Sequence, residues 1–289
     1  MLILLIPSLL FLIAVFALPL IRYGWLSFHA DSVMTGLIAI PNQGANWQRF
    51  IHDSRYWQDL LQTLRFALVS VTAEVILGLV IALILNQPLR KRALIRSSSL
   101  IPWALPTTVM ALGWRWIFNT PYGPVDRLVQ TGLGRSLNAL GEPSLAWITT
   151  VYADVWKTTP FVALILLAGL QTIPSDLYEA AKLEGAGSWI CLRRITIPLL
   201  LPYLGLALMF RLAQAFGVFD LIQVMTGGGP ASSTESIALY AYWNAMRFLD
   251  FGYSATIMIA SFVILSSLIA IAWFIISMAR KGSVGALAE

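Results

Sequence analysis

Six long runs of apolar residues alternate with shorter polar segments along the chain. The runs lie near residues 2–28, 60–86, 97–119, 146–171, 198–225 and 252–279. Each is long enough to cross a hydrocarbon core of about 30 Å, which takes roughly 20 helical residues. A membrane β-barrel would instead show segments of about ten residues with alternating hydrophobicity. The pattern therefore predicts an all-α polytopic membrane protein with six transmembrane helices, forming one domain over residues 1–289.

Composition supports this prediction. Hydrophobic residues make up 58% of the 289 residues and charged residues only 11%, against about half and a quarter in a soluble domain. A soluble globule is therefore excluded. The first run could be taken for a signal peptide, but it has no basic leading segment and ends in an aromatic cluster with Tyr23, Trp25 and Phe28. Such clusters favour the membrane interface, so we expect a retained span.

Basic residues are divided unequally between the loops. Nine of them lie in the segments 87–96 and 172–197 and in the C-terminal tail, whereas the other loops hold five, together with seven acidic residues. Because loops rich in Lys and Arg remain in the cytoplasm, we expect both termini to be cytoplasmic. The net charge of +5 is then explained by membrane anchoring. Since no basic-aromatic module accompanies the charge, we expect no nucleic acid partner.

Several charged side chains lie inside or near the predicted spans, where charge is expensive in lipid. Arg22, Arg65 and Arg115 lie close enough to span ends to reach the interface. Asp154 and Lys157 lie three residues apart on one face of the fourth span. They can form a structural ion pair or line a transport path, and the residues alone leave both possibilities open.

A path for a polar solute through the spans would combine a few hydrogen-bonding groups with flat apolar faces. The fourth and fifth spans supply both kinds of group. The candidate path residues are Asp154, Trp156, Lys157, Gln214, Phe216, Phe219 and Asp220. The triple glycine at 227–229 lacks the lysine and following helix of a phosphate-binding loop, so we expect an external turn there.

The loop at 172–197 contains a short polar helix, predicted over 174–184. Ser175 is a plausible N-cap, and Glu179 lies near the positive end of the helix dipole. Gly185 and Gly187 follow, and glycine readily adopts the left-handed turn that ends a helix. A polar helix across a cytoplasmic loop suits a partner surface, although by physics alone it can be a simple loop element.

The same loop carries a longer signature. It reads Glu179-Ala180-Ala181, three residues, Gly185, nine residues, and Ile195-Thr196-Ile197-Pro198. This resembles the signature of the inner-membrane permease subunits of ABC importers, with Ile197 where leucine is usual. The segments 100–106 and 114–118 are similar to the carbohydrate branch of that family. Residues 225–230 resemble its first permease kind, the maltose and glycerol-phosphate type.

The resemblance implies the type I ABC importer permease fold, in a bacterial inner membrane. In this family the signature helix is the coupling helix, which docks in a groove of a cytoplasmic ATPase. The implied ATPase-coupling residues are Glu179, Ala180, Ala181 and Gly185. The implied partners are a second homologous permease subunit, two cytoplasmic ATPase subunits, an extracytoplasmic solute-binding protein, the sugar substrate and membrane lipid.

No P-loop of the form GxxxxGK[ST] occurs in the chain, so ATP and Mg are expected on the ATPase subunits. We expect the chain itself to hold no cofactor and no metal, and to be a transport subunit and not an enzyme. It has neither HExxH nor GxSxG. Cys191, the only cysteine, is expected to be an inert thiol.

The substrate is the least determined part of the prediction. The deep cations Lys157 and Arg211 are balanced by Asp154, Glu74 and Asp220, which suits a neutral sugar or a glycosylated polyol. Glycerol phosphate or a related anion is the alternative, because a phosphorylated ligand would need the cations. A proton-coupled carrier is a further alternative, but it would leave the coupling signature unexplained.

Overall fold

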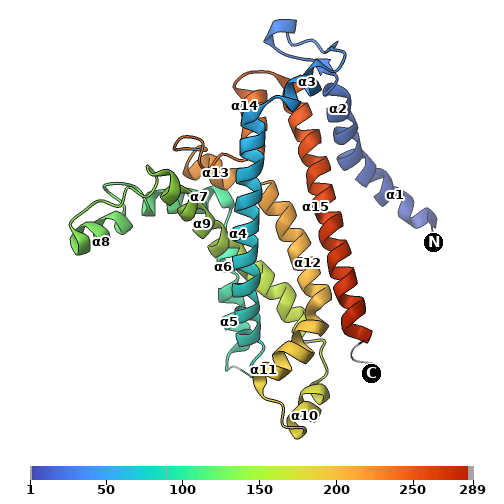
Figure 1. The fold of residues 1–289 in the computed structure, drawn as a ribbon, viewed down its shortest axis with the longest axis vertical. Helices are drawn as coiled ribbons and strands as arrows, with labels where there is room; N and C mark the ends of the chain where they lie inside the picture. The colour runs from blue at the N-terminus through green and yellow to red at the C-terminus, as the bar shows by residue number, and fades with distance from the viewer. Residues whose placement is uncertain (1, 89, 286–289) are drawn as a thin grey trace. The chain divides into compact units, whose positions relative to one another are not determined.

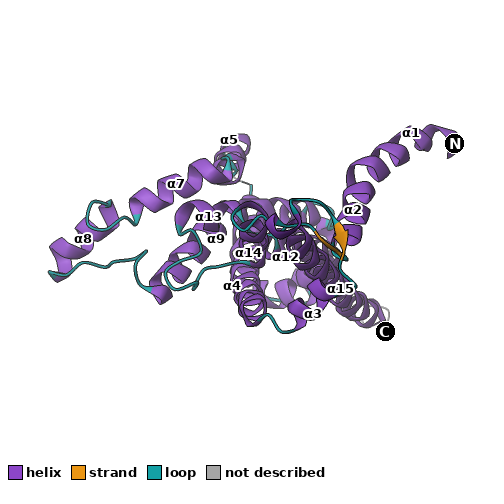
Figure 2. Cartoon of the chain, turned by 90° about the horizontal axis from the view of Figure 1, so that it is seen from above, coloured by secondary structure: helices purple, strands orange, loops and turns teal. Residues whose placement is uncertain are grey.

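The structure, a computed structural model, describes residues 2–88 and 90–285. Helices make up most of the described chain, and Figure 1 shows their order from the N-terminus to the C-terminus. Figure 2 shows the two short strands β1 and β2 in orange among the helices. The prediction of a helical membrane protein is confirmed.

Contacts within the chain define two compact units. The first unit comprises Met1–Thr63 and Glu235–Ser266, and the second comprises Leu64–Thr234 and Ser267–Glu289. The helices α4 (Ser54–Leu85) and α15 (Phe251–Gly285) contribute residues to both units. The single permease domain remains a prediction.

The first unit begins with an apolar helical stretch and continues with a small hairpin. Its elements are α1 (Leu2–Leu12), the π-helical η1 (Ile13–Ala17), α2 (Leu18–Leu26), β1 (His29–Ala30), η2 (Val33–Thr35), β2 (Ile40–Pro41), α3 (Ala45–Ile51), the start of α4, α14 (Ile237–Met246) and the start of α15. The strands pair antiparallel, with His29 opposite Pro41. The left-handed φ of +66° at Gly36 closes the turn between them.

Polar contacts join α4, α14 and α15 within the first unit. Arg55 donates two hydrogen bonds to the Glu235 carboxylate, at 2.9 and 3.0 Å. Asp53 lies just before α4 and accepts hydrogen bonds from the hydroxyls of Tyr240, at 2.7 Å, and Tyr253. Partial burial favours the neutral carboxyl group, but these hydrogen bonds outweigh burial and hold the pKa of Asp53 below its ordinary value.

The second unit contains the rest of the helices. Its elements are the remainder of α4, α5 (Arg92–Ser99), α6 (Ile101–Ala104), α7 (Thr107–Ile117), α8 (Pro124–Leu133), α9 (Pro143–Leu170), α10 (Ser175–Leu183), α11 (Ser188–Cys191), the π-helical η3 (Leu192–Thr196), α12 (Ile197–Phe216), α13 (Asp220–Met225) and the end of α15. Its order places the short helix α10 between the long helices α9 and α12.

The core of the second unit lies where α4, α9 and α12 pack together. Ala82, Val162 and Leu200 are fully buried in this cluster. Close approach depends on small residues, as is common between membrane helices. A Cβ atom on Gly78 would lie 2.7 Å from the Val162 side chain, and one on Gly169 would lie 2.6 Å from the Tyr203 ring. These two glycines therefore set the helix spacing.

Five helical stretches in the described chain have the length and hydropathy of membrane spans. They are Ile6–Leu26, Ser54–Leu85, Pro143–Leu170, Ser188–Phe216 and Phe251–Met278. The predicted third span, 97–119, is not one helix. It is broken at Leu105, whose extended backbone (φ −69°, ψ 137°) precedes Pro106, because proline disfavours a helical residue before it. The predicted fifth span also ends early, at Phe216, and a separate short helix begins at Asp220.

Candidate substrate path and coupling loop

A buried ion cluster joins three helices of the second unit. Arg211 of α12 is only 1% exposed. Its Nη2 lies 2.8 Å from Glu74 Oε1 of α4 and 2.9 Å from Asp154 Oδ2 of α9, and its Nε also donates to Glu74. Arg211 Nη1 donates to Gln214 Oε1 at 2.8 Å. The Thr158 hydroxyl lies 2.7 Å from Glu74 Oε1 and completes the cluster.

Of the two possibilities left open for Asp154 and Lys157, the described structure does not show the ion pair between them. Spacing along α9 allows that pair, but Asp154 is paired with Arg211 from another helix. The sequence analysis identified Asp154, Lys157 and Arg211 as charged residues in the spans. It did not predict that Asp154 pairs with Arg211, because the two lie 57 residues apart. Buried charges need hydrogen-bonded partners, and a guanidinium can serve two carboxylates at once.

Lys157 instead donates hydrogen bonds to backbone carbonyl oxygens at the point where the predicted third span is broken. Its ammonium group donates to the carbonyl oxygen of Leu105 at 2.6 Å and to that of Trp103 at 3.2 Å. A helix end leaves its last carbonyl oxygens without intrahelical donors, and Pro106 has no N–H to offer. Inside a membrane such groups must find partners in the protein or in a water-filled cavity. Lys157 is half-buried, so part of its side chain remains accessible.

Aromatic rings lie along the same helices, α6, α7 and α9. Trp103 stacks on Phe161 with 5.5 Å between ring centroids. Trp114 meets the edges of Trp156 at 5.5 Å and Tyr152 at 5.2 Å. Trp103, Tyr152 and Trp156 keep exposed surface. We call the five aromatic residues named here, together with Lys157, the aromatic row. Of its members, the sequence predicted Trp156 and Lys157 as path residues and missed the other four.

The candidates from the fifth predicted span differ in accessibility. Phe216 is only 5% exposed and packs inside the second unit, so its face is covered. Phe219 is half-buried, whereas Gln214 and Asp220 are exposed. Asp220 begins α13, where a carboxylate is favoured by the helix dipole. Between the two aromatic candidates of this segment, Phe219 is therefore the more exposed.

The predicted helix in the loop is α10, and its end follows the sequence. Gly185 has a left-handed φ of +81°. The Ala186 N–H donates to the Ala181 carbonyl at 2.9 Å, which is the bond of a glycine-terminated helix. The start differs: Pro174 occupies the N-cap position and Ser175 is already helical, with its hydroxyl turned to Asp176. Proline can occupy this position because its φ suits a helix start.

Side chains around α10 divide into anchored and exposed groups. The Tyr178 hydroxyl lies 2.9 Å from Thr196 Oγ1, which ties α10 to the segment leading into α12. Glu179 and Ala180 are exposed, and Ala181 is half-buried. Leu183 is 90% exposed and Trp189 is 70% exposed. The loop thus presents acidic and apolar side chains beside a backbone that is held in place.

The triple glycine forms a turn, as predicted. Gly227 and Gly228 have left-handed φ values of +62° and +87°. The hydroxyls of Thr226 and Thr234 lie 2.7 Å apart across the turn.

Cys191 is buried, with its thiol 3.9 Å from the Ala186 carbonyl oxygen.

Residues 74–280 match the family described as the binding-protein-dependent transport system inner membrane component. This chain belongs to that family. It is 43% identical over 90% of its length to the trehalose/maltose transport system permease protein MalF of Thermococcus litoralis, of which it covers 88%. It is 36% identical over 90% of its length to the sulfoquinovosyl glycerol transport system permease protein SmoG of Agrobacterium fabrum, of which it covers 85%.

The fold of this permease subunit is also found in a solved structure. A bacterial ABC transporter involved in the import of the acidic polysaccharide alginate matches 96% of this chain and 94% of its own, with a TM-score of 0.80 at 19% identity. The type I importer permease fold is thereby confirmed. The chain is a multi-pass inner-membrane subunit of a binding-protein-dependent transport system, and its relatives are transport system permease proteins.

Proposed function

We propose that this permease subunit forms half of the path through which an ATP-driven importer moves a neutral sugar or a glycosylated polyol. The aromatic row, which includes Lys157, carries the proposal. Flat apolar faces and a few hydrogen-bonding groups are what a sugar site requires. A relative named for trehalose and maltose transport supports a neutral sugar. The relative named for sulfoquinovosyl glycerol, whose sulfonate is anionic, supports the broader class of glycosides.

The charges of the second unit favour a neutral ligand. Arg211 is satisfied by Glu74 and Asp154 and is sealed from solvent, so it has no surface for an anion. Lys157 is half-exposed and already donates to two carbonyl oxygens. An anionic ligand would have to compete for this one amine. The alternative of glycerol phosphate or a related anion therefore rests on Lys157 alone.

We further propose that α10 is the coupling helix. One of the two cytoplasmic ATPase subunits, which hold ATP and Mg, would dock on Glu179, Ala180, Ala181 and Gly185. The exposed side chains of Leu183 and Trp189 support a partner surface, since large exposed apolar residues grouped on one loop are typical of docking sites. Both termini would then be cytoplasmic. A second homologous permease subunit would complete the path, and an extracytoplasmic solute-binding protein would deliver the substrate.

The ion cluster gives this proposal a mechanical basis. α9 and α12 directly flank the coupling loop, and Asp154 and Arg211 fasten them to each other. Packed helices move as units, and do not deform continuously. A push on α10 would therefore reach the aromatic row through α9 as a rigid-body shift.

The test is reconstitution of the complete transporter in liposomes with its solute-binding protein. We expect ATP hydrolysis to rise with binding protein loaded with a neutral sugar. Trp156→Ala should lower uptake while basal ATP hydrolysis continues. Stimulation by a phosphorylated polyol alone, abolished by Lys157→Gln, would establish the anion alternative. Uptake driven by a pH gradient without ATP would contradict the importer proposal.

A further inference from the structure

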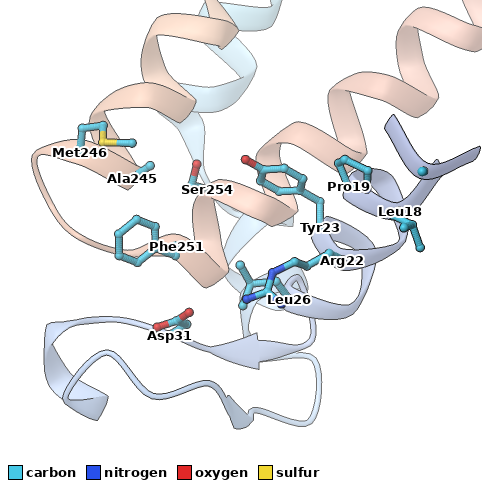
Figure 3. Close-up of a pocket in the computed structure, with 11 residues that line it drawn as sticks. Leu18, Pro19, Arg22, Tyr23, Leu26, Asp31, Ala245, Met246, Phe251 and Ser254 are labelled. Atoms are coloured by element: carbon cyan, nitrogen blue, oxygen red, sulfur yellow. The ribbon is translucent and has the colours of Figure 1, made fainter. Parts of the chain in front are cut away.

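A pocket of about 660 Å³ lies within the first unit, next to α2. One wall is α2 with the π-helical segment before it, and the other is formed by the end of α14 and the start of α15 (Figure 3). Ala14, Leu18, Arg22 and Leu26 line the first wall. They are spaced four residues apart and so lie on one helix face. This face is apolar except for Arg22.

Two opposite charges border the pocket. Figure 3 shows the Arg22 side chain projecting from α2 and the Asp31 carboxylate on the segment near the short strands, and both residues line the pocket. Neither side chain has a hydrogen bond or an ion pair among the residues that the structure describes. Arg22 is exposed and Asp31 is half-buried. The two charges are therefore available to a ligand.

The Asp31 position is fixed by the backbone. Its carbonyl oxygen accepts the N–H groups of Phe251, at 2.8 Å, and Gly252, at 3.2 Å. Gly252 has no room for a side chain, because a Cβ atom would lie 2.2 Å from the His29 carbonyl oxygen. The Asp31 backbone is thus held at the start of α15, and its side chain lines the pocket from this position.

The pocket lies at one end of a membrane span. Arg22 and Tyr23 are in the last turns of the span Ile6–Leu26, followed by Trp25 and Phe28. Aromatic and basic residues at such positions mark the level of lipid headgroups. The apolar positions Leu18 and Ala14 lie deeper in the same span and line the same pocket.

We propose that this pocket binds one phospholipid with a zwitterionic headgroup. Its phosphate would pair with Arg22, its amino group would pair with Asp31, and an acyl chain would lie along Leu18 and Ala14. An anionic lipid would satisfy Arg22 but would meet the Asp31 carboxylate. An ethanolamine headgroup fits better than a choline one, because a primary ammonium donates hydrogen bonds to a carboxylate and a quaternary ammonium does not.

The test uses the complete transporter in nanodiscs of equal amounts of phosphatidylethanolamine and phosphatidylglycerol, followed by native mass spectrometry of the lipids that it retains. We expect the wild type to retain phosphatidylethanolamine in preference to phosphatidylglycerol. Arg22→Gln should reduce phosphatidylethanolamine retention about fivefold. Asp31→Asn should shift the preference about fivefold toward phosphatidylglycerol. Arg127→Gln, which removes an exposed arginine of α8 outside the pocket, should change neither value.

Two results would overturn the proposal. The first is a ratio of the two lipids that is the same in the wild type, Arg22→Gln and Asp31→Asn. The second is a cross-link from Leu18→Cys to the second permease subunit in nearly every complex, which would show that protein fills the pocket. Arg22 and Asp31 keep part of their surface exposed, so these variants are expected to fold, and their thermal unfolding checks this.

Discussion

The ion cluster and the coupling loop are both polar, but they use their polar groups in opposite ways. In the cluster, Arg211, Glu74 and Asp154 are buried and each side chain has a partner. In the loop, Glu179 is exposed, and Leu183 beside it is 90% exposed. A charge inside a span is usually taken as a sign of function. Here the sealed charges are explained by internal pairing, and the exposed loop has the surface that a partner needs.

This difference separates two kinds of defect. A change in the cluster should first reduce the amount of folded protein, because it strands a charge in the interior. A change on the loop should leave folding intact and reduce transport. The predictions that follow test this separation.

Arg211→Met should have the largest effect on folding. It leaves Glu74 and Asp154 without their cation, and breaking a buried pair costs about 3–5 kcal/mol. The matched control is Arg49→Met, since Arg49 pairs with Asp250 at 2.8 Å and is exposed, and exposed pairs contribute about 0–1 kcal/mol. The stability of the two variants is measured by thermal unfolding in detergent and by the yield of inserted protein.

A triple variant sharpens this prediction. Combining Arg211→Met with Glu74→Gln and Asp154→Asn removes all three charges at once, so no charge is stranded. We expect part of the lost stability to return. If Arg211→Met and Arg49→Met unfold at the same temperature, burial does not distinguish the two pairs and the comparison fails.

Gly185→Val should be the most damaging single change in the loop. Its φ of +81° is a conformation that a β-branched residue strongly disfavours. A Cβ atom there would meet nothing within 4 Å, so the defect would be purely conformational. Gly187→Val is the matched control, because Gly187 also has open space but has a φ of −73°. We expect uptake to fall at least tenfold in the first variant and to stay near normal in the second.

Glu179→Ala should lower transport without lowering the amount of folded protein. The side chain is exposed and forms no ion pair with the residues that the structure describes. Loss of a charged partner at a protein interface reduces affinity, here by about tenfold or more. The measurements are uptake and co-purification of the ATPase. Glu184→Ala removes a neighbouring exposed acid at a position that the signature leaves unspecified, and it should be near normal. Normal uptake by Glu179→Ala would contradict the docking proposal.

The sequence predicted regions of the molecule better than partnerships within it. Apolar runs located the spans because hydrophobicity is a local property, and the signature located α10 and its end at Gly185. The break at Leu105 also had a local signal, the following Pro106. The pairing of Arg211 with Glu74 had no local signal in the sequence, since 137 residues separate them. A spacing rule along one helix suggested Lys157 as the partner of Asp154, and it failed because a neighbouring helix supplied a better one.

The smallest predicted effect concerns Asp53, a charged group in the first unit that lies outside the spans and is only half-buried. Hydrogen bonds from Tyr253 and Tyr240 outweigh burial and keep the pKa of Asp53 below its ordinary value. Its contribution to stability is therefore fully present above the ordinary value of about 4 and is lost as the pH falls through the lower pKa of the folded protein. We expect a loss below about 1 kcal/mol, because solvent screens the site.

The unfolding temperature of Asp53→Asn should lie below that of the wild type at pH 7 and approach it at pH 3. A difference that stays constant between these pH values would show that Asp53 acts through the shape of its hydrogen bonds and not through its charge.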